Sequence, residues 1–429
     1  MRFALILVLL AFGPALTEIA WEETALPSGA RLLVVDSDNP GQAMITLAWP
    51  AGMATSLENP DLALLAPRLF LQRSFEGGRS LKELLRGIAW GWKLRLGRDN
   101  SFLQFFGPKE EMPEVIGALL EEVGTSLSTH QGEVDAAFES LQKERSRWRK
   151  NPEIFLRAGL DSLRYPGHPY RIGEGKALQS LNAPLLEDMQ TFLTEHYGAN
   201  SCTFLILADL DPDAFLSDWL PRFDALTGKR KLLSLLPEDP GSRGDLEMEG
   251  SPGRTLLLWQ FPLPGGWGRE RADIVLASGI IQPLLVQSFR GLVASATASC
   301  DFLPRGPARL EIQVRGFLPG DLPRIEKTLE RILDRLGKTE FSEMQVVTAK
   351  DQVLQRLSLH SSRSDRPLPR KETDLRNWSL ELLRQQLSIR DKRSQFELAI
   401  LKANMDSIAE RSRRYLTLEQ RSRGLLQAP

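Results

Sequence analysis

Few residues of this sequence have the types and the spacing that catalysis or metal binding requires. The chain of 429 residues contains four histidines and two cysteines: His130, His168, His196, His360, Cys202 and Cys300. None of them forms a C-x-x-C, H-x-x-E-H or H-x-x-x-H pattern, so the usual zinc-ligand spacings are missing. A G-x-S-x-G nucleophile elbow and a complete P-loop are missing too. The residues by themselves therefore predict no catalytic residue and no metal ligand.

The composition is that of a globular protein and argues against nucleic-acid binding. Hydrophobic residues make up 42% of the chain, and 54 basic and 55 acidic residues give a formal charge of 54 − 55 = −1. Proteins that bind nucleic acid normally carry a strongly basic face. The Arg-rich runs 145–150 and 411–414 fall in helical patterns. We interpret them as solvated helix faces.

The N-terminus has the pattern of an export signal. Met1-Arg2 is followed by ten apolar residues, 3–12, and then by Gly13-Pro14-Ala15. Ten residues are too few to span a bilayer, which needs about 20. We therefore predict a secretory signal peptide over 1–17, with a cleavage point between Ala15 and Ala20, and no integral membrane segment. The expected location is the periplasm, with secretion beyond the cell as the alternative.

The rest of the chain divides into two halves of similar length. A polar run rich in Pro and Gly, predicted to be a linker over 237–254, separates residues 18–236 from residues 255–429. Each half ends in an amphipathic helix, an aromatic residue, a polar turn and an apolar strand, at 185–208 and at 404–426. These matching ends predict two tandem domains of related structure.

Strand and helix patterns within each half predict the α+β class. In the first half, strands are expected at 30–36, 43–50, 88–95 and 101–106, and helices at 60–74, 81–86, 109–127, 133–148, 152–163 and 184–197. In the second half, strands are expected at 255–261, 292–300 and 308–315, and helices at 269–289 and 322–336, with further helices before a closing strand. Strands in pairs and helices in runs indicate a mostly antiparallel sheet with helices on one face. Asp406 and Ser407 are the expected N-cap of the last helix.

The two cysteines lie in apolar, strand-like runs of different halves. We favour two buried free thiols for Cys202 and Cys300. A disulfide and a reactive thiol remain the alternatives.

Several segments, in this order, resemble the insulinase/pitrilysin-type zinc metallopeptidases and their inactive relatives. The segments are Tyr165-Pro166-Gly167-His168-Pro169-Tyr170, the run 185–212 that ends in Ala208-Asp209-Leu210-Asp211-Pro212, Phe289-Arg290-Gly291-Leu292-Val293, and Arg414-Tyr415-Leu416-Thr417. The resemblance covers nearly the whole mature chain. It implies a pair of α+β domains of related topology, which the repeat predicts independently. The resemblance further implies that this pair forms half of a clam-shell chamber.

The chain departs from this family where the active members bind zinc. Active members carry H-x-x-E-H on the first helix, and a downstream Glu completes the zinc site. By the resemblance, Leu64 stands at the first His, Pro67 at the general base and Arg68 at the second His, while Glu144 falls near the third ligand. Leucine cannot ligate a metal, and arginine brings a positive charge to the place of the cation. We therefore expect no catalytic residue and no zinc in this chain. Pro67 is also expected to kink or shorten its helix.

The resemblance gives one candidate substrate-binding residue. The family's second half contributes an Arg and a Tyr that grip the substrate backbone. Arg290 is the candidate for that Arg, and the alternative is that it is a charge at a helix end; the Tyr position is Ala294. His168 is expected to pack or hydrogen-bond, and His196 to be a helix-end cation.

These features predict a non-catalytic subunit that pairs with an active zinc metallopeptidase homologue, or with itself, around peptide substrates. A peptide could add as a strand to an exposed sheet edge, for which the strand 101–106 is the candidate. The alternative for Phe102 and Phe105 of that strand is that both are core residues. A scaffold protein of the cell envelope with the same fold is the alternative function, and an enzyme of unrelated chemistry is a third.

Overall fold

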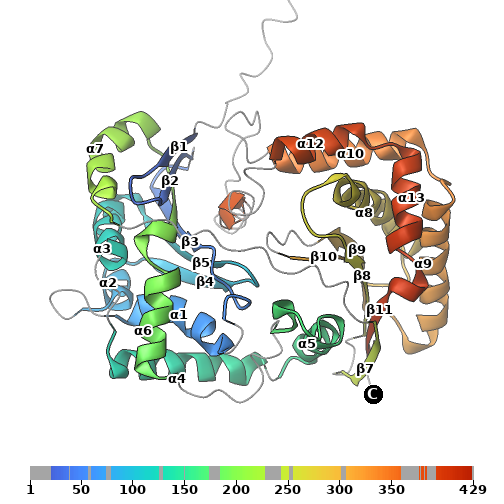
Figure 1. The fold of residues 1–429 in the computed structure, drawn as a ribbon, viewed down its shortest axis with the longest axis horizontal. Coiled ribbons are helices and arrows are strands. Elements are labelled where there is room, and N and C mark those ends of the chain that lie inside the picture. Colours follow the sequence, from blue (N-terminus) through green and yellow to red (C-terminus); the bar gives the residue numbers. More distant parts are fainter. Residues whose placement is uncertain are drawn as a thin grey trace, which may run out of the picture.

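The computed structural model describes residues 21–37, 39–56, 59–73, 79–124, 129–148, 150–172, 184–227, 243–250, 255–300, 306–358, 376, 378–380, 382–383 and 393–427. The predicted signal peptide, 1–17, lies outside these residues. Figure 1 shows two bodies, each with a sheet backed by helices, on either side of a central space. Among the described residues, no helix is both long and apolar enough to cross a membrane.

The first half is built on a six-stranded sheet with the order β1-β2-β6-β3-β5-β4. Its strands are β1 (Trp21–Ala25), β2 (Arg31–Asp36), β3 (Gln42–Trp49), β4 (Gly91–Leu96), β5 (Ser101–Pro108) and β6 (Thr203–Ala208). All neighbours are antiparallel except β2 and β6. The strands β2, β3 and β6 are buried on both faces, which explains their nearly continuous apolar sequences.

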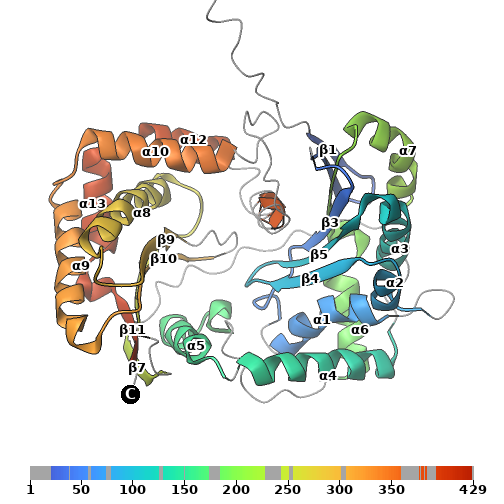
Figure 2. The same cartoon turned by 180° about the vertical axis from the view of Figure 1, so that it is seen from behind.

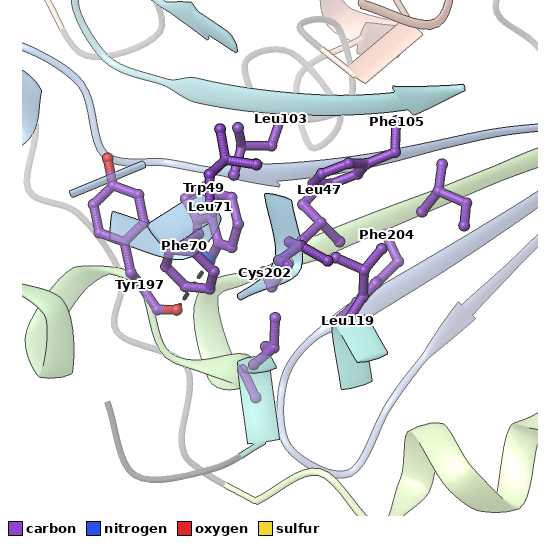
Figure 3. Close-up of a cluster of buried hydrophobic side chains, with 14 of the residues drawn as sticks. Leu47, Trp49, Phe70, Leu71, Leu103, Phe105, Leu119, Tyr197, Cys202 and Phe204 are labelled. Carbon is purple, nitrogen blue, oxygen red and sulfur yellow. Dashed lines mark hydrogen bonds between the residues drawn. The ribbon is translucent and has the colours of Figure 1, made fainter. Parts of the chain in front are cut away.

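Helices cover one face of this sheet. They are α1 (Pro60–Gln72), α2 (Leu81–Gly87), α3 (Met112–Gly124), α4 (Gln131–Trp148), α6 (Leu186–His196) and α7 (Pro212–Asp224). The core between the sheet and these helices includes an aromatic group, Trp49, Phe70 and Tyr197, with ring centroids 4.9–6.0 Å apart (Figure 3). Trp49 Nε1 donates a hydrogen bond of 3.1 Å to the Tyr197 carbonyl. This bond ties the end of α6 to the middle of the sheet.

The second half is built on a five-stranded sheet with the order β7-β11-β8-β10-β9. Its strands are β7 (Asp245–Glu249), β8 (Leu256–Leu263), β9 (Ser295–Cys300), β10 (Ala308–Arg315) and β11 (Ser422–Gln427). Its helices are α8 (Arg269–Ser288), α9 (Leu322–Gly337), α10 (Glu343–Ser358), α12 (Arg393–Lys402) and α13 (Met405–Tyr415). Three of its four strand pairs are antiparallel. The predicted α+β class with two mostly antiparallel sheets is therefore confirmed.

The two sheets have the same topology, and this confirms the internal repeat. The order β2-β6-β3-β5-β4 of the first half matches β7-β11-β8-β10-β9 of the second, and β1 is extra. The strands that close the two predicted repeat units, β6 and β11, occupy equivalent places. Each has a parallel and an antiparallel neighbour. Duplicated topology explains why the two halves end in similar sequences.

Some boundaries differ from the predictions. The predicted linker 237–254 includes β7, which pairs in parallel with β11, so part of this run belongs to the second sheet. Its alternation of charged and apolar residues carried the signal for this strand. The N-cap of α13 is Asn404 and not Asp406. The Asn404 side chain accepts a hydrogen bond from Ser407 N, and Ser407 Oγ accepts one from Asn404 N. The strand β1 and the helix α7 were not predicted.

Helical residues of each half also pack on the sheet of the other half. The helix α5 (Pro152–Arg164) follows α4 in the chain but packs on the open face of the second sheet, where Leu156 and Leu160 join Leu256, Leu258 and Leu426. In return, the helical residues 378–380 and 382–383 pack on the open face of the first sheet. Figures 1 and 2 show these two helices in the central space between the bodies. Each sheet thus has helical residues packed on both of its faces.

Candidate functional site

The structure brings together three of the four positions at which the resemblance places the zinc motif. Leu64 and Arg68 lie one turn apart on α1, and Glu144 lies on α4, which packs against α1. The guanidinium of Arg68 donates to the carboxylate of Glu144 and to the carbonyl oxygen of Leu64. The side chain of Arg68 is 7% exposed and that of Glu144 is 42% exposed. A nearly buried positive charge therefore lies between an acidic side chain and a backbone carbonyl.

A second charged contact joins the same two helices. Arg145, the residue after Glu144, places Nη2 3.9 Å from Oδ1 of Asp61 near the start of α1. The Arg145 side chain is buried. Asp61 lies in the first turn of α1, where a negative charge is favoured by the helix dipole. The two neighbouring residues of α4 thus hold α1 at two points through charges of opposite sign.

A cavity of about 240 Å³ opens beside the Arg68–Glu144 pair. It is lined by three charged residues, Arg68, Arg95 and Glu144, and by six apolar ones, Met53, Leu64, Leu94, Leu96, Trp148 and Ile154. Leu94 and Leu96 belong to β4, the last strand of the first sheet. The cavity therefore lies between the edge of this sheet and the two helices that carry the paired charges.

The residues of this site do not fit a zinc ion. Zinc needs donor atoms with lone pairs, and neither the Leu64 side chain nor the Arg68 guanidinium has one to give. The single carboxylate, Glu144, is already bound by Arg68. Across the part of the chain that the structure describes, no group of three or more His, Cys, Asp or Glu residues is arranged to hold a metal ion.

Pro67 was expected to kink or shorten its helix, and it does not shorten it. The helix α1 continues through Pro67 to Gln72. Pro67 itself is buried among the residues of this helix that face the core. Because proline has no N–H, the helix lacks the hydrogen bond that residue 67 would otherwise donate.

The second-half candidate, Arg290, is not brought to this site. It follows α8, is exposed, and makes no hydrogen bond or ion pair with another described residue. The backbone N–H of Ala294, at the position of the family's Tyr, donates to the carbonyl of Arg315 at 2.9 Å. The methyl side chain of Ala294 has no group that can hydrogen-bond to a peptide.

The packing and hydrogen bonds of His168, His196 and the two cysteines indicate structural roles. The buried His168 accepts a hydrogen bond of 3.0 Å at Nδ1 from Tyr170 N and packs against the Tyr170 ring. His196 ends α6, with Nε2 3.6 Å from Oε2 of Glu195. Cys202 and Cys300 are both free, as favoured, but only Cys202 is buried, whereas Cys300 is half-buried. Burial raises the pKa of the Cys202 thiol. His360 lies outside the described residues.

The predicted sheet edge was wrong. The strand β5 lies between β3 and β4, so residues 101–106 are internal to the sheet. Phe102 and Phe105 are both buried, on opposite faces, as the alternative required. The edge is β4, whose alternation of Lys93 and Arg95 with Leu94 and Leu96 was the signal that sequence reasoning missed.

The fold places the chain among structures that are already known. The chain has the two-domain fold of M16-type (insulinase/pitrilysin-type) peptidase structures. A protease from Helicobacter pylori superposes with a TM-score of 0.72 at 15% identity, over 96% of this chain and 100% of that chain. A peptidase M16 inactive domain from Pseudomonas fluorescens gives 0.70 at 14% identity, over 95% and 98%. For pitrilysin the TM-score is 0.71 at 15% identity, over 94% of this chain and 44% of that one. No protein-family model and no curated protein matches the sequence.

Proposed function

We propose that this chain is a non-catalytic M16-type subunit, exported to the periplasm, that pairs with an active zinc metallopeptidase homologue and helps to hold its peptide substrates. The observation that carries this proposal is the Arg68–Glu144 pair. In a metal site, a divalent cation would neutralise the negative charge of the Glu144 carboxylate. Here the Arg68 guanidinium neutralises this charge, and a guanidinium cannot activate water as a metal ion does. The fold shared with an M16 inactive domain supports the proposal.

The architecture of the chain supports the proposed pairing. Two tandem domains form half of the chamber that the resemblance implies, so a second subunit is needed to close it. A zinc-bearing homologue would supply the metal and the general base. This chain would form part of the chamber wall and would contact the bound peptide. Zinc is therefore expected only in the partner.

The test is a pull-down of the tagged chain from its native host. Zinc content and hydrolysis of a peptide library are measured on the purified chain and on the captured complex, each with and without a chelator. We expect the chain alone to hold no zinc and to be inert, and the complex to contain zinc and to lose peptidase activity on chelation. Stoichiometric zinc in the chain alone, or hydrolysis by it, would overturn the proposal. Capture of a non-peptidase complex would favour the envelope scaffold instead. Capture of a second copy of the chain, with no other protein, would favour a homodimer.

A further inference from the structure

The last residue of α5, Arg164, is a buried cation. Only 2% of it is exposed, yet its terminal nitrogens, Nη1 and Nη2, make no hydrogen bond with any residue that the structure describes. A guanidinium stays protonated at physiological pH, so burial does not remove its charge. Taking such a charge out of water is costly unless hydrogen bonds and a counter-charge replace the lost hydration. The two nitrogens therefore need an acceptor.

The carboxylate one turn earlier on α5, Asp161, is already shared by two other arginines. Its Oδ1 accepts from Nη1 of Arg309 at 2.5 Å and lies 2.6 Å from Nη2 of Arg98. The charge of Arg164 acts on the same carboxylate as a third guanidinium. Burial and the charge of Arg309 both lower the pKa of Arg164. Positive charge is thus in surplus at Arg164.

A second buried donor lies beside this guanidinium. The hydroxyl of Tyr165 is buried and, within the described part of the chain, has no hydrogen-bond partner. It favours the charge of Arg164 without being aligned to accept a hydrogen bond from it. The guanidinium carbons of Arg164 and Arg98 lie 5.7 and 5.5 Å from the centre of the Tyr165 ring. Such contacts stabilise the charges but give the N–H groups no acceptor.

The acceptor that suits these donors is small and negatively charged. A side chain that is 2% exposed offers no surface to a bulky ligand. A water molecule has lone pairs but no charge to offset a guanidinium. A monatomic anion has both, and hydrogen bonds between ions are stronger than those between neutral groups.

We infer that Arg164 and Tyr165 bind a small inorganic anion, of the size of chloride, between the two halves of the chain. The helix α5 packs on the second sheet, and Arg98 belongs to the β4–β5 turn of the first half (Figure 1). By offsetting the charge of Arg164, the anion strengthens the connection that Asp161 makes between the halves. This inference does not depend on the proposed pairing with a peptidase.

The test compares thermal unfolding of the purified full-length chain in sodium chloride and in sodium gluconate at equal ionic strength. Gluconate is too large for a site enclosed in this way. We expect the melting temperature to rise by about 1–2 °C for each tenfold increase in chloride, because an anion that binds only the folded state stabilises it by mass action. Bromide should replace chloride, and crystals soaked in sodium bromide should show anomalous scattering beside the Arg164 guanidinium.

Arg164→Met, which keeps an apolar side chain and removes the charge, locates the site. Its melting temperature should not depend on chloride, whereas the control Arg324→Met, the same change at an exposed position of α9, should keep the wild-type dependence. In gluconate, Arg164→Met should be at least as stable as the wild type, which has a buried charge without its counter-ion there.

Circular dichroism checks that both variants are folded. Equal melting temperatures of the wild type in the two salts, or a chloride dependence that survives Arg164→Met, would overturn the inference. Bromide-soaked crystals without anomalous scattering beside Arg164 would overturn it too. This last measurement uses the wild-type chain, so it decides the question even if Arg164→Met does not fold.

Discussion

At the scale of the residue, Arg68 connects two helices through a nearly buried charge. Its guanidinium links α1 to α4 through Glu144, and it also bonds the Leu64 carbonyl within its own helix. Removing one member of such a pair leaves the other charge without compensation, which destabilises more than the pair stabilises. Glu144 keeps contact with water, so the net contribution of the pair is modest.

Restoring the zinc motif tests whether these positions are equivalent to the metal site. The variant Leu64→His/Pro67→Glu/Arg68→His writes H-x-x-E-H onto α1 beside Glu144. We expect it to gain about one zinc per chain, because two imidazoles and a carboxylate would then converge. Adding Glu144→Gln should weaken zinc binding by about tenfold or more. Zinc content and zinc-dependent melting temperature provide the measurement. A folded variant that binds no zinc would show that the alignment of α1 is wrong.

Glu122 makes the stability of the first half depend on pH. Its carboxylate lies on α3, buried, with Oε1 3.0 Å from Nη1 of Arg73. Burial, which outweighs the attraction of Arg73, raises the pKa of Glu122 from 4.5 to about 7. A raised carboxyl pKa gives stability that is fully present below pH 4.5 and is lost as the pH rises through about 7.

The expected loss between these pH values is at most about 3 kcal/mol. In Glu122→Gln, which cannot ionise, this part of the pH dependence should disappear. Urea unfolding of both proteins across the pH range provides the measurement. Glu121→Gln, on the exposed neighbouring position, is the matched control and should leave the profile unchanged. A wild-type free energy of unfolding that stays level between pH 5 and 7 would contradict the assigned pKa.

At the scale of elements, the equivalent edge strands of the two halves differ in their charge and in their contacts with side chains. The strand β9, Ser295–Cys300, contains no charged residue, whereas β4 contains Lys93 and Arg95. An uncharged edge invites pairing with other chains. Gln282 of α8 protects it by bonding Ala296 and Ala298. The charged strand needs no such cover against self-association, because like charges repel.

Removing the cover should therefore promote association. In Gln282→Ala, the backbone groups of Ala296 and Ala298 lose their side-chain partner, at a cost of about 1 kcal/mol. We expect a concentration-dependent increase in mass by light scattering. Gln345→Ala, whose side chain bonds Ser342 at an exposed helix start, is the control and should stay unchanged. An unchanged mass for Gln282→Ala would show that β9 is protected by something other than this amide.

At the scale of the whole molecule, charges on α5 fasten the two halves together. Asp161 is buried and accepts from Arg309 of β10 at 2.5 Å, and its Oδ1 lies 2.6 Å from Nη2 of Arg98 in the β4–β5 turn. One turn earlier, Arg157 donates to Glu311 at 2.7 Å. Asp161 thus joins the second sheet to the β4–β5 turn of the first half. The surrounding arginines hold the pKa of Asp161 and of Glu311 below their usual values, despite burial.

Asp161→Ala should loosen this connection. It leaves Arg98 and Arg309 as close, poorly compensated charges, which typically costs about 3–5 kcal/mol. We expect urea unfolding, followed by the fluorescence of Trp49 and Trp259 in the two cores, to change from one transition to two. The exposed Asp334→Ala, which breaks only the surface pair with Lys338, is the control. A single, unshifted transition would show that apolar packing of α5 suffices.

The same carboxylates predict behaviour in acid. A lowered pKa gives stability that is present above the unfolded value, 3.8 for Asp161 and 4.5 for Glu311, and is lost as the pH falls further. The halves of the wild-type protein should therefore separate in acid before either core unfolds.

The sequence by itself determined the local elements and the repeat. Apolar periodicity located α3 and α9, turn residues located the β4–β5 hairpin, and similar endings revealed the duplication. The missing zinc motif was also visible, since the residue types at 64, 67 and 68 cannot serve as ligands. These features depend on neighbours in the chain, which a sequence shows directly.

Only the tertiary structure decided what lies side by side. The pairing of Arg68 with Glu144 spans 76 positions, and that of Asp161 with Arg309 spans 148. No local pattern shows that α5 packs on the sheet of the other half, or that β4 and not β5 is the edge. Sheet order and helix exchange are set by which apolar faces bury each other in the complete fold, and contacts between such distant residues leave no periodicity in the chain.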